Sequence, residues 1–332
     1  MRAAENGSTY RKSLSNVSLL HLAAQTKKKH LIVSAIEHAA MLETAKQLSK
    51  AGYEVSCAPV DEFGRVDLDA LRALVREDTA LVGVMAANNE VGTIQPVGEI
   101  AAIAHAKGAL MFTDAVQAAG VLELDVRALG VDLMSASAHK IYGPKGVGML
   151  YVRNGVKIEN LIAGGHQERT RRGGTTNVPG VVGFAEAFRL AAENIEANNA
   201  YVTALRDRLI DRVQAEVPDV KLNGHRTLRL PANADFSFRY IEGESVLFSL
   251  DLAGIAVSSG SACSSGSLEP SHVLLAMGLP EELAHGSIRF TLGKHNTEEE
   301  VDYTVESLKA IVARLRDMSP LFSAAGGEGN YV

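Results

Sequence analysis

Short apolar runs alternate with amphipathic stretches from about residue 30 to about residue 152. The apolar runs cover residues 30–34, 53–60, 79–87, 109–114, 132–138 and 147–152. The stretches with helical spacing cover residues 39–51, 67–77, 97–107 and 125–130. Alternation of strands with helices favours a mostly parallel sheet that is covered on both faces. This part of the chain therefore predicts an α/β fold.

The pattern changes in the second half of the chain. A long amphipathic stretch precedes a segment in which strands and helices follow one another. The stretch covers residues 179–217, and the elements after it are expected at residues 235–240, 244–253 and 255–259. A final helix is expected at residues 297–317, because Thr297 and the glutamates after it suit a helix amino end. We expect a large domain over residues 1–190 and a smaller α+β domain over residues 191–332.

Composition narrows the possible functions. The 332 residues are 46% hydrophobic, which is enough for a large core, and the net charge of -6 comes without a long basic run. The chain therefore has no footprint for nucleic acid, and no apolar run approaches the length of a membrane span. Two cysteines are too few for a disulfide framework, and no signal peptide is visible at the start. These features predict a cytoplasmic protein.

Two charged residues stand at the ends of neighbouring apolar runs. Asp114 closes one run, and Lys140 follows the next, with the short helical segment 125–130 between them. If the runs form adjacent parallel strands, both residues lie at the carboxyl edge of the sheet, where open α/β folds bind ligands. This pair suits pyridoxal phosphate, which needs a lysine for its aldehyde and an acid beside its pyridine nitrogen. Each residue alone is more typical of a solvated strand end.

Seven motifs occur in order along the chain. They are Glu37-His38, Asn88-Asn89-Glu90-Val91-Gly92, Thr113-Asp114-Ala115-Val116-Gln117, Ser135-Ala136-Ser137-Ala138-His139-Lys140, Arg172-Gly173-Gly174-Thr175, Ser258-Ser259-Gly260-Ser261-Ala262-Cys263 and Ser287-Ile288-Arg289-Phe290. With them the sequence resembles the cysteine desulfurases, pyridoxal-phosphate enzymes that supply sulfur for iron–sulfur cluster assembly. The resemblance runs from about residue 30 to about residue 318. It implies the fold type I architecture of pyridoxal-phosphate-dependent transferases, with a small carboxyl-terminal domain that carries the catalytic cysteine loop.

The resemblance implies a role for each residue around the cofactor ring. Lys140 would attach the cofactor and later move the α-proton of the substrate. Asp114 would hold the pyridine nitrogen, while Gln117 and Asn89 would contact the edge of the ring that carries the phenolic oxygen. His38 would stack on the ring and could shuttle protons when sulfur leaves. Without its motif, His38 would be more typical of a core histidine.

The phosphate and the substrate carboxylate have their own implied partners. Ser137 and His139 would bind the phosphate, and Thr175 would reach it from the neighbouring subunit, so the resemblance implies a homodimer. Thr175 is otherwise an ordinary loop threonine. Arg289 would clamp the substrate carboxylate by two parallel hydrogen bonds, with Asn89 beside the substrate as well. A surface ion pair is the alternative for Arg289.

The two cysteines lie in different surroundings. Cys263 is in a run of small polar residues, SSGSACSSGS, which is typical of an exposed mobile loop. The resemblance implies that its thiolate takes sulfur from L-cysteine as a persulfide and passes it to an iron–sulfur scaffold protein. Attack at neutral pH needs a lowered thiol pKa or proton transfer to His38. No structural metal site is indicated, although iron could meet Cys263 through its persulfide. Cys57, inside an expected strand, is expected to be buried and unreactive.

Members of this family carry a longer amino-terminal portion, with a Gly-Thr-Glu turn whose amides bind the phosphate. Here Gly7-Ser8-Thr9 stands at about the right distance before His38, but Tyr10 occupies the position of the acid. The sequence thus predicts a chain that lacks this portion and binds its cofactor more weakly. Two alternatives stay open: an inactive homologue that acts as an interaction subunit, and a related lyase that acts on selenocysteine.

Overall fold

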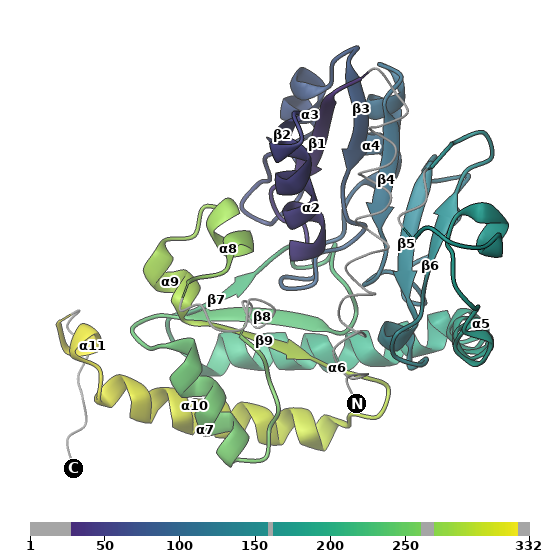
Figure 1. Ribbon diagram of the computed structural model, residues 1–332. Helices are drawn as coiled ribbons and strands as arrows, with labels where there is room; N and C mark the ends of the chain where they lie inside the picture. Colours follow the sequence, from purple (N-terminus) through teal and green to yellow (C-terminus); the bar gives the residue numbers. More distant parts are fainter. Residues whose placement is uncertain (1–27, 159–161, 260–268, 325–332) are drawn as a thin grey trace. The chain divides into compact units, whose positions relative to one another are not determined.

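The computed structural model describes residues 28–158, 162–259 and 269–324 (Figure 1). These residues divide into two compact units. Unit 1 holds residues 28–60, 65–88, 94–158 and 162–195. Unit 2 holds residues 61–64, 89–93, 196–259 and 269–324. Two short pieces from the first half of the chain therefore belong to the second unit.

Unit 1 is built on a six-stranded sheet with the order β2-β1-β3-β4-β5-β6. The strands are β1 (His30–Ser34), β2 (Glu54–Ala58), β3 (Thr79–Gly83), β4 (Leu110–Asp114), β5 (Leu133–Ser137) and β6 (Gly148–Val152). Neighbours from β2 to β5 pair in parallel, and β6 pairs with β5 in the antiparallel direction. The predicted α/β fold with a mostly parallel sheet is confirmed.

Helices cover both faces of this sheet. Successive strand residues point to opposite faces. Leu31 packs in a cluster with side chains of α2 (Ala39–Lys50), whereas Ile32 packs with side chains of α3 (Leu68–Leu74) and α4 (Val97–His105). Because both faces are covered, β1, β3 and β5 are buried along their whole length, as is typical of central parallel strands.

The prediction of a helix at residues 125–130 is wrong, because residues 126–130 form turns. The Asp125 carboxylate accepts hydrogen bonds from the backbone amides of Arg127 (2.8 Å) and Ala128 (3.2 Å). Gly130 then takes a left-handed φ of 66°, a conformation that ends a helical turn. The chain therefore makes one turn after Asp125 and leaves the helical conformation at Gly130.

The prediction that Cys57 is buried is also wrong. Cys57 lies on β2, which is the edge strand of the sheet, and its side chain is exposed. An edge strand has a neighbour on one side alone, so its side chains are covered less completely than those of central strands. The sequence of β2 does not reveal this position, since strand order depends on the whole fold.

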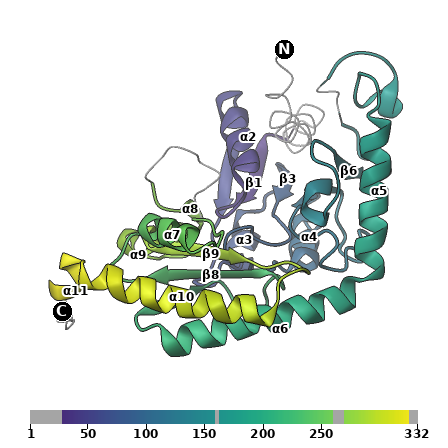
Figure 2. The same ribbon diagram turned by 90° about the horizontal axis from the view of Figure 1, so that it is seen from below.

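Unit 2 contains a three-stranded antiparallel sheet with the order β7-β8-β9. Its strands are β7 (Val220–Asn223), β8 (Asn233–Phe238) and β9 (Ser287–Thr291). Phe236 and Phe238 pack in one core with side chains of three helices: α6 (Ile195–Glu216), α7 (Gly243–Leu252) and α10 (Glu298–Asp317). Figure 2 shows α6 and α10 running alongside each other.

Both long helical stretches that the sequence predicts in the second half of the chain are helical in the structure. The stretch predicted at 179–217 forms two helices, α5 (Val178–Glu193) and α6, which meet at Asn194. The predicted final helix is confirmed as α10, and Thr297 and Glu300 form a capping box at its start. The remaining short helices are η1 (Ala138–Ile141), η2 (Gln167–Thr170), α8 (His272–Ala276), α9 (Glu281–His285) and α11 (Pro320–Ala324). Within the described ranges, no helix is both long and apolar enough to cross a membrane.

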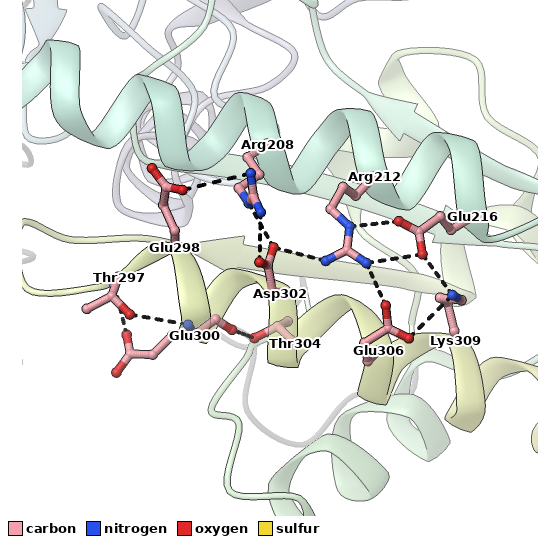
Figure 3. Close-up of polar contacts among 10 residues, drawn as sticks. All are labelled: Arg208, Arg212, Glu216, Thr297, Glu298, Glu300, Asp302, Thr304, Glu306 and Lys309. Carbon is pink, nitrogen blue, oxygen red and sulfur yellow. Dashed lines mark hydrogen bonds and ion pairs between the residues drawn. The ribbon is translucent and has the colours of Figure 1, made fainter.

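Charged side chains join α6 to α10 on the surface of unit 2 (Figure 3). Arg208 donates to both carboxylate oxygens of Asp302 at 2.7 Å. Arg212 donates to Asp302 at 2.9 Å and to Glu306 at 2.6 Å. The hydrogen bonds from Arg208 are the main reason why the pKa of Asp302 falls to about 2. This charged seam therefore stays ionised over the physiological pH range.

Candidate active site

The carboxyl ends of β4 and β5 bring the predicted acid and lysine to one edge of the sheet in unit 1. Asp114 is the last residue of β4 and pairs in register with Ser135 of the parallel strand β5. Lys140 follows β5 directly, within the 3-10 turn η1, and its side chain is exposed. Both residues therefore lie at the carboxyl edge of the sheet, as the sequence predicts.

Asp114 is a half-buried carboxyl group. It accepts hydrogen bonds from the Val116 amide at 2.9 Å and the Ser135 hydroxyl at 3.2 Å. Burial raises the pKa of Asp114, while the Val116 amide, the charge of His38 and the Ser135 hydroxyl act in the opposite direction. An ionised Asp114 therefore gains stability from any positive charge that binds beside it.

His38 is the N-cap of α2 and stands directly before its first residue, Ala39. Its Nδ1 accepts the Ala40 amide at 3.1 Å, so in the neutral ring the proton resides on Nε2. The ring is half-buried, and its charge acts on the pKa of Asp114. The hydrogen bond thus fixes the tautomer and the orientation of the ring, both of which a proton-transfer role requires.

Sequence reasoning gave no role to Glu37 and Asn88, although both belong to the quoted motifs. Oε1 of Glu37 accepts the Ser34 hydroxyl at 2.6 Å and the Met85 amide at 2.8 Å. Asn88 donates to the Ile36 carbonyl at 2.9 Å. These bonds join the segment that carries His38 to the segment after β3. Burial raises the pKa of the fully buried Glu37 carboxyl to about 8.

The predicted phosphate ligands of β5 and η1 contact each other. The hydroxyl of Ser137 lies 2.7 Å from Nδ1 of His139. Ser137 is buried at the end of β5, and His139 is half-buried one residue before Lys140. The turn closes on Tyr142, which takes a left-handed φ of 61°. Side-chain donors and the lysine amine are thereby concentrated on a few consecutive residues.

Gln117 and Thr175 lie on two other parts of unit 1. Gln117 is half-buried in the turn that follows Asp114. Thr175 is exposed on the loop between η2 and α5, where Arg172 donates to the backbone carbonyls of Gly174 and Thr175 at 3.2 Å. The Arg172 contacts order the loop backbone and leave the Thr175 side chain at the surface.

Arg289 and Asn89 are brought together in unit 2. Nη1 of Arg289 donates to the Asn89 carbonyl at 2.8 Å, although the two residues are 200 positions apart. Nη2 donates to the Ser258 hydroxyl at 3.3 Å, and the backbones of Ser258 and Arg289 pair as an isolated bridge. The strand predicted at residues 255–259 is thus reduced to this one bridge. The guanidinium is held on two sides.

Two sequence predictions fall outside the described residues: the thiol of Cys263, within residues 260–268, and the possible phosphate turn Gly7-Ser8-Thr9. In the described part of the chain, no group of three or more His, Cys, Asp or Glu side chains is placed to hold a metal ion.

The donor set at the edge of unit 1 fits pyridoxal phosphate. A protonated pyridine nitrogen would supply the positive charge that a buried Asp114 carboxylate needs. Lys140 would reach the aldehyde from an exposed turn, and the Ser137 and His139 pair offers polar groups for a phosphate. A parallel α/β sheet with these groups at its carboxyl edge defines the class: an enzyme that uses pyridoxal phosphate.

Comparison with known proteins identifies the family within this class. The sequence matches the aminotransferase class-V family over residues 6–304. The cysteine desulfurase IscS of Clostridium botulinum is 50% identical over 311 residues, covering 92% of this chain and 78% of that protein. The IscS of Dictyoglomus turgidum is 52% identical over 298 residues, covering 90% and 76%. The chain therefore belongs to the cysteine desulfurases of the class-V aminotransferase family, whose members depend on pyridoxal phosphate.

Solved structures agree with this assignment. A structure titled "NIFS-LIKE PROTEIN" superposes with a TM-score of 0.85 at 41% identity, covering 92% of this chain and 81% of that chain. A structure titled "SspA in complex with cysteine" superposes with a TM-score of 0.74 at 30% identity, covering 86% and 80%. The fold type I architecture expected from the sequence is confirmed.

Proposed function

We propose that this chain converts L-cysteine to L-alanine and keeps the released sulfur as a persulfide on Cys263. The observation that carries this proposal is the 50% identity to a cysteine desulfurase over 92% of the chain, together with the acid and the lysine at one sheet edge. The reaction needs no external oxidant. The carbon–sulfur bond of the substrate breaks, and a sulfur–sulfur bond forms on Cys263. The hydrogen that the Cys263 thiol loses is balanced by the hydrogen that the β-carbon of the substrate gains.

Pyridoxal phosphate would supply an electron sink for the substrate's α-carbon. The protein's own groups then do the rest. Asp114 would hold the positive charge of the pyridine nitrogen, and Gln117 and Asn89 would contact the ring edge. Lys140 would attach the cofactor and carry the α-proton, and His38 would present its ring for stacking and proton transfer. The strand end at Asp114, the turn at Lys140 and the N-cap position of His38 support these roles, which are the ones that the resemblance implies.

The phosphate and the substrate are held by different residues. Ser137, His139 and Thr175 bind the phosphate, and Arg289 pairs with the substrate carboxylate through two N–H groups. Thr175 is exposed in the single chain, which supports a second copy completing the site as a homodimer. An iron–sulfur scaffold protein in the cytoplasm is the proposed acceptor of the persulfide sulfur, and iron would meet Cys263 there as cargo.

The test measures alanine and persulfide together. Protein supplied with pyridoxal phosphate and L-cysteine is assayed for alanine, and its peptides are examined by mass spectrometry for an added sulfur atom. Cys263→Ser should bind the cofactor but lose the persulfide, because a hydroxyl is a far poorer nucleophile toward sulfur than a thiolate. Cys57→Ser, which removes the exposed thiol of β2, is the matched control and should keep the persulfide.

A persulfide on Cys57 in the native protein would contradict the role of Cys263. No cofactor absorbance and no alanine would instead favour an inactive interaction subunit, and turnover of selenocysteine alone would favour a lyase. The alternatives are thus separated by one set of measurements.

A further inference from the structure

A row of four polar side chains crosses the small sheet of unit 2. Asn223 of β7 pairs in register with Asp235 of β8, and Asp235 pairs with Arg289 of β9. Arg289 in turn bridges to Ser258. Residues directly opposite each other in antiparallel strands point to the same face of the sheet. The four side chains therefore lie side by side, with Arg289 between a carboxylate and a hydroxyl.

Contacts within the row leave one donor and two acceptors buried without a partner in the described part of the chain: Nε of Arg289, Oδ2 of Asp235 and Oδ1 of Asn223. Asn223 donates to Oδ1 of Asp235 at 2.7 Å. Arg289 uses Nη1 for the Asn89 carbonyl and Nη2 for the Ser258 hydroxyl. Oδ2 of Asp235 and Nε of Arg289 are both buried, and neither has a hydrogen-bond partner among the described residues. These two atoms carry opposite charge and belong to residues in register.

Charged groups from several elements face Asp235. Arg289 approaches it from β9 and Arg229 from the segment before β8, while Glu90 approaches it from the short piece 89–93. Burial, with Asp235 only 1% exposed, is the main cause that raises its pKa to about 7. Glu90 raises the pKa further, whereas the Asn223 hydrogen bond, Arg289 and Arg229 lower it. Asp235 thus changes charge near neutral pH.

We propose that Asp235 is a positioning residue for Arg289: its carboxylate holds the guanidinium so that the free N–H groups face the carboxylate of the substrate. This inference rests on the proposed function, in which Arg289 binds that carboxylate. A guanidinium has five N–H groups. Asn89 and Ser258 occupy one each, on Nη1 and Nη2, whereas Nε makes no hydrogen bond to any residue that the structure describes and belongs to the residue in register with Asp235. One N–H on each terminal nitrogen then remains, which is the fork that suits a carboxylate.

Substrate affinity should depend on the charge of Asp235 and therefore on pH. Asp235 carries a negative charge above its pKa of about 7 and is neutral below it. The guanidinium is therefore held firmly at pH 8 and loosely at pH 6. Substrate affinity should follow this change, because a preorganised donor binds more tightly than one that must be ordered on binding. The chemical step, which depends on unit 1 and Cys263, should not follow it.

The experiment measures kcat and KM for L-cysteine from pH 6 to pH 8.5 in the holoenzyme. Asp235→Asn keeps the shape of the side chain and removes its charge. At pH 8 we expect KM to rise about tenfold with kcat within about twofold, since the negative charge opposite the Arg289 guanidinium is lost. At pH 6 the variant and the native enzyme should converge. Asp302→Asn, a neutralised aspartate on the surface of the same unit, should leave both constants unchanged.

A second variant keeps the proposal testable if Asp235→Asn does not fold. The Asn223 hydrogen bond lowers the pKa of Asp235, so Asn223→Ala should move the midpoint of the KM profile to higher pH. Arg289→Lys separates the two hypotheses. If Arg289→Lys leaves KM unchanged, the proposed role of Arg289 is wrong. If Arg289→Lys raises KM while Asp235→Asn and Asn223→Ala change neither KM nor its pH profile, Arg289 keeps its role and the positioning role of Asp235 is refuted.

Discussion

The two units place buried acids in opposite ways. In unit 1, Asp114 stands at the end of a strand and Glu37 just after one, and both accept hydrogen bonds from uncharged donors. In unit 2, Asp235 stands in the middle of a strand beside Arg289 and within the field of Arg229. Burial raises the pKa of all three acids. The difference is the partner: in unit 1 the acids accept hydrogen bonds from uncharged groups, whereas in unit 2 the charges of Arg289 and Arg229 act on Asp235.

Each unit suits a ligand group of a different charge. A strand-end carboxyl whose hydrogen-bond donors are uncharged suits a positively charged ring nitrogen, because the ligand then offsets the cost of burying the carboxylate. A guanidinium held between polar neighbours suits a negatively charged substrate group. Unit 1 thus offers a carboxylate and unit 2 a guanidinium, each suited to a ligand group of opposite charge.

Lys140 gives the largest expected effect and tests the edge of unit 1. Lys140→Ala should lower alanine formation by about 10²–10⁴-fold, because it removes the amine that attaches the cofactor and moves the proton. Borohydride reduction followed by peptide mass spectrometry should find the cofactor on the Lys140 peptide of the native protein alone. Lys145→Ala, a change at an exposed lysine in the next turn along the chain, should keep both activity and labelling. A labelled Lys145 would show that the wrong lysine was assigned.

Glu37 gives the next effect, and it concerns stability. The folded protein keeps the proton of Glu37 up to a pKa of about 8, whereas the unfolded chain releases it near 4.5. The unfolded state therefore binds fewer protons between these values, and the free energy of unfolding falls as pH rises through this window. Glu37→Gln removes this dependence. Relative to the native protein it should gain stability from pH 5 to pH 8, on the order of 3 kcal/mol.

Denaturant unfolding of the apoprotein at several pH values measures the gain. Glu43→Gln is the matched control, since it makes the same substitution on α2 at an exposed side chain paired with Lys46. Parallel pH curves for Glu37→Gln and the native protein would mean that Glu37 is ionised in the folded state. The Ser34 and Met85 hydrogen bonds would then be charge-assisted, and the contrast with unit 2 would weaken.

Sequence reasoning succeeded where the signal is local. The strands β1 and β4 coincide with apolar runs, and Asp114 and Lys140 follow directly from the ends of such runs. The capping box of α10 is likewise written in a few consecutive residues, from Thr297 to Glu300. Local patterns of this kind depend on neighbours in the chain, so they are visible without the fold.

The sequence failed where position depends on distant parts of the chain. Cys57 is exposed because β2 is an edge strand, and strand order is set by the whole sheet. Asn89 meets Arg289 across 200 residues, and the row that contains Asp235 exists only after three strands pair. The buried Glu37 gave no separate signal either, since its partner is the backbone amide of Met85.

Asp302 gives the smallest expected effect and extends the comparison to an exposed acid. Arg208 and Arg212 hold its pKa at about 2, so its contribution is present above the ordinary aspartate pKa and is lost as pH falls toward 2. This direction is opposite to that of Glu37. Asp302→Asn should lower the melting temperature at pH 7 by no more than about 3 °C, because exposed ion pairs contribute little.

The effect of Asp302→Asn should shrink further in 1 M salt, which screens exposed charges. It should also shrink at pH 2.5, which lies below the ordinary aspartate pKa and close to the native value of about 2, so that most of the pH-dependent contribution is lost. Calorimetry of the native and variant proteins at pH 7, in 1 M salt and at pH 2.5 measures the loss of melting temperature under each condition. Asp69→Asn, an exposed aspartate paired with one arginine within α3, is the control for a single pair. A loss that is larger for Asp302→Asn than for Asp69→Asn would show that the seam between α6 and α10 acts as a network. Equal losses would mean that Asp302 contributes no more than an isolated surface pair, and that the stability of unit 2 rests on its buried core.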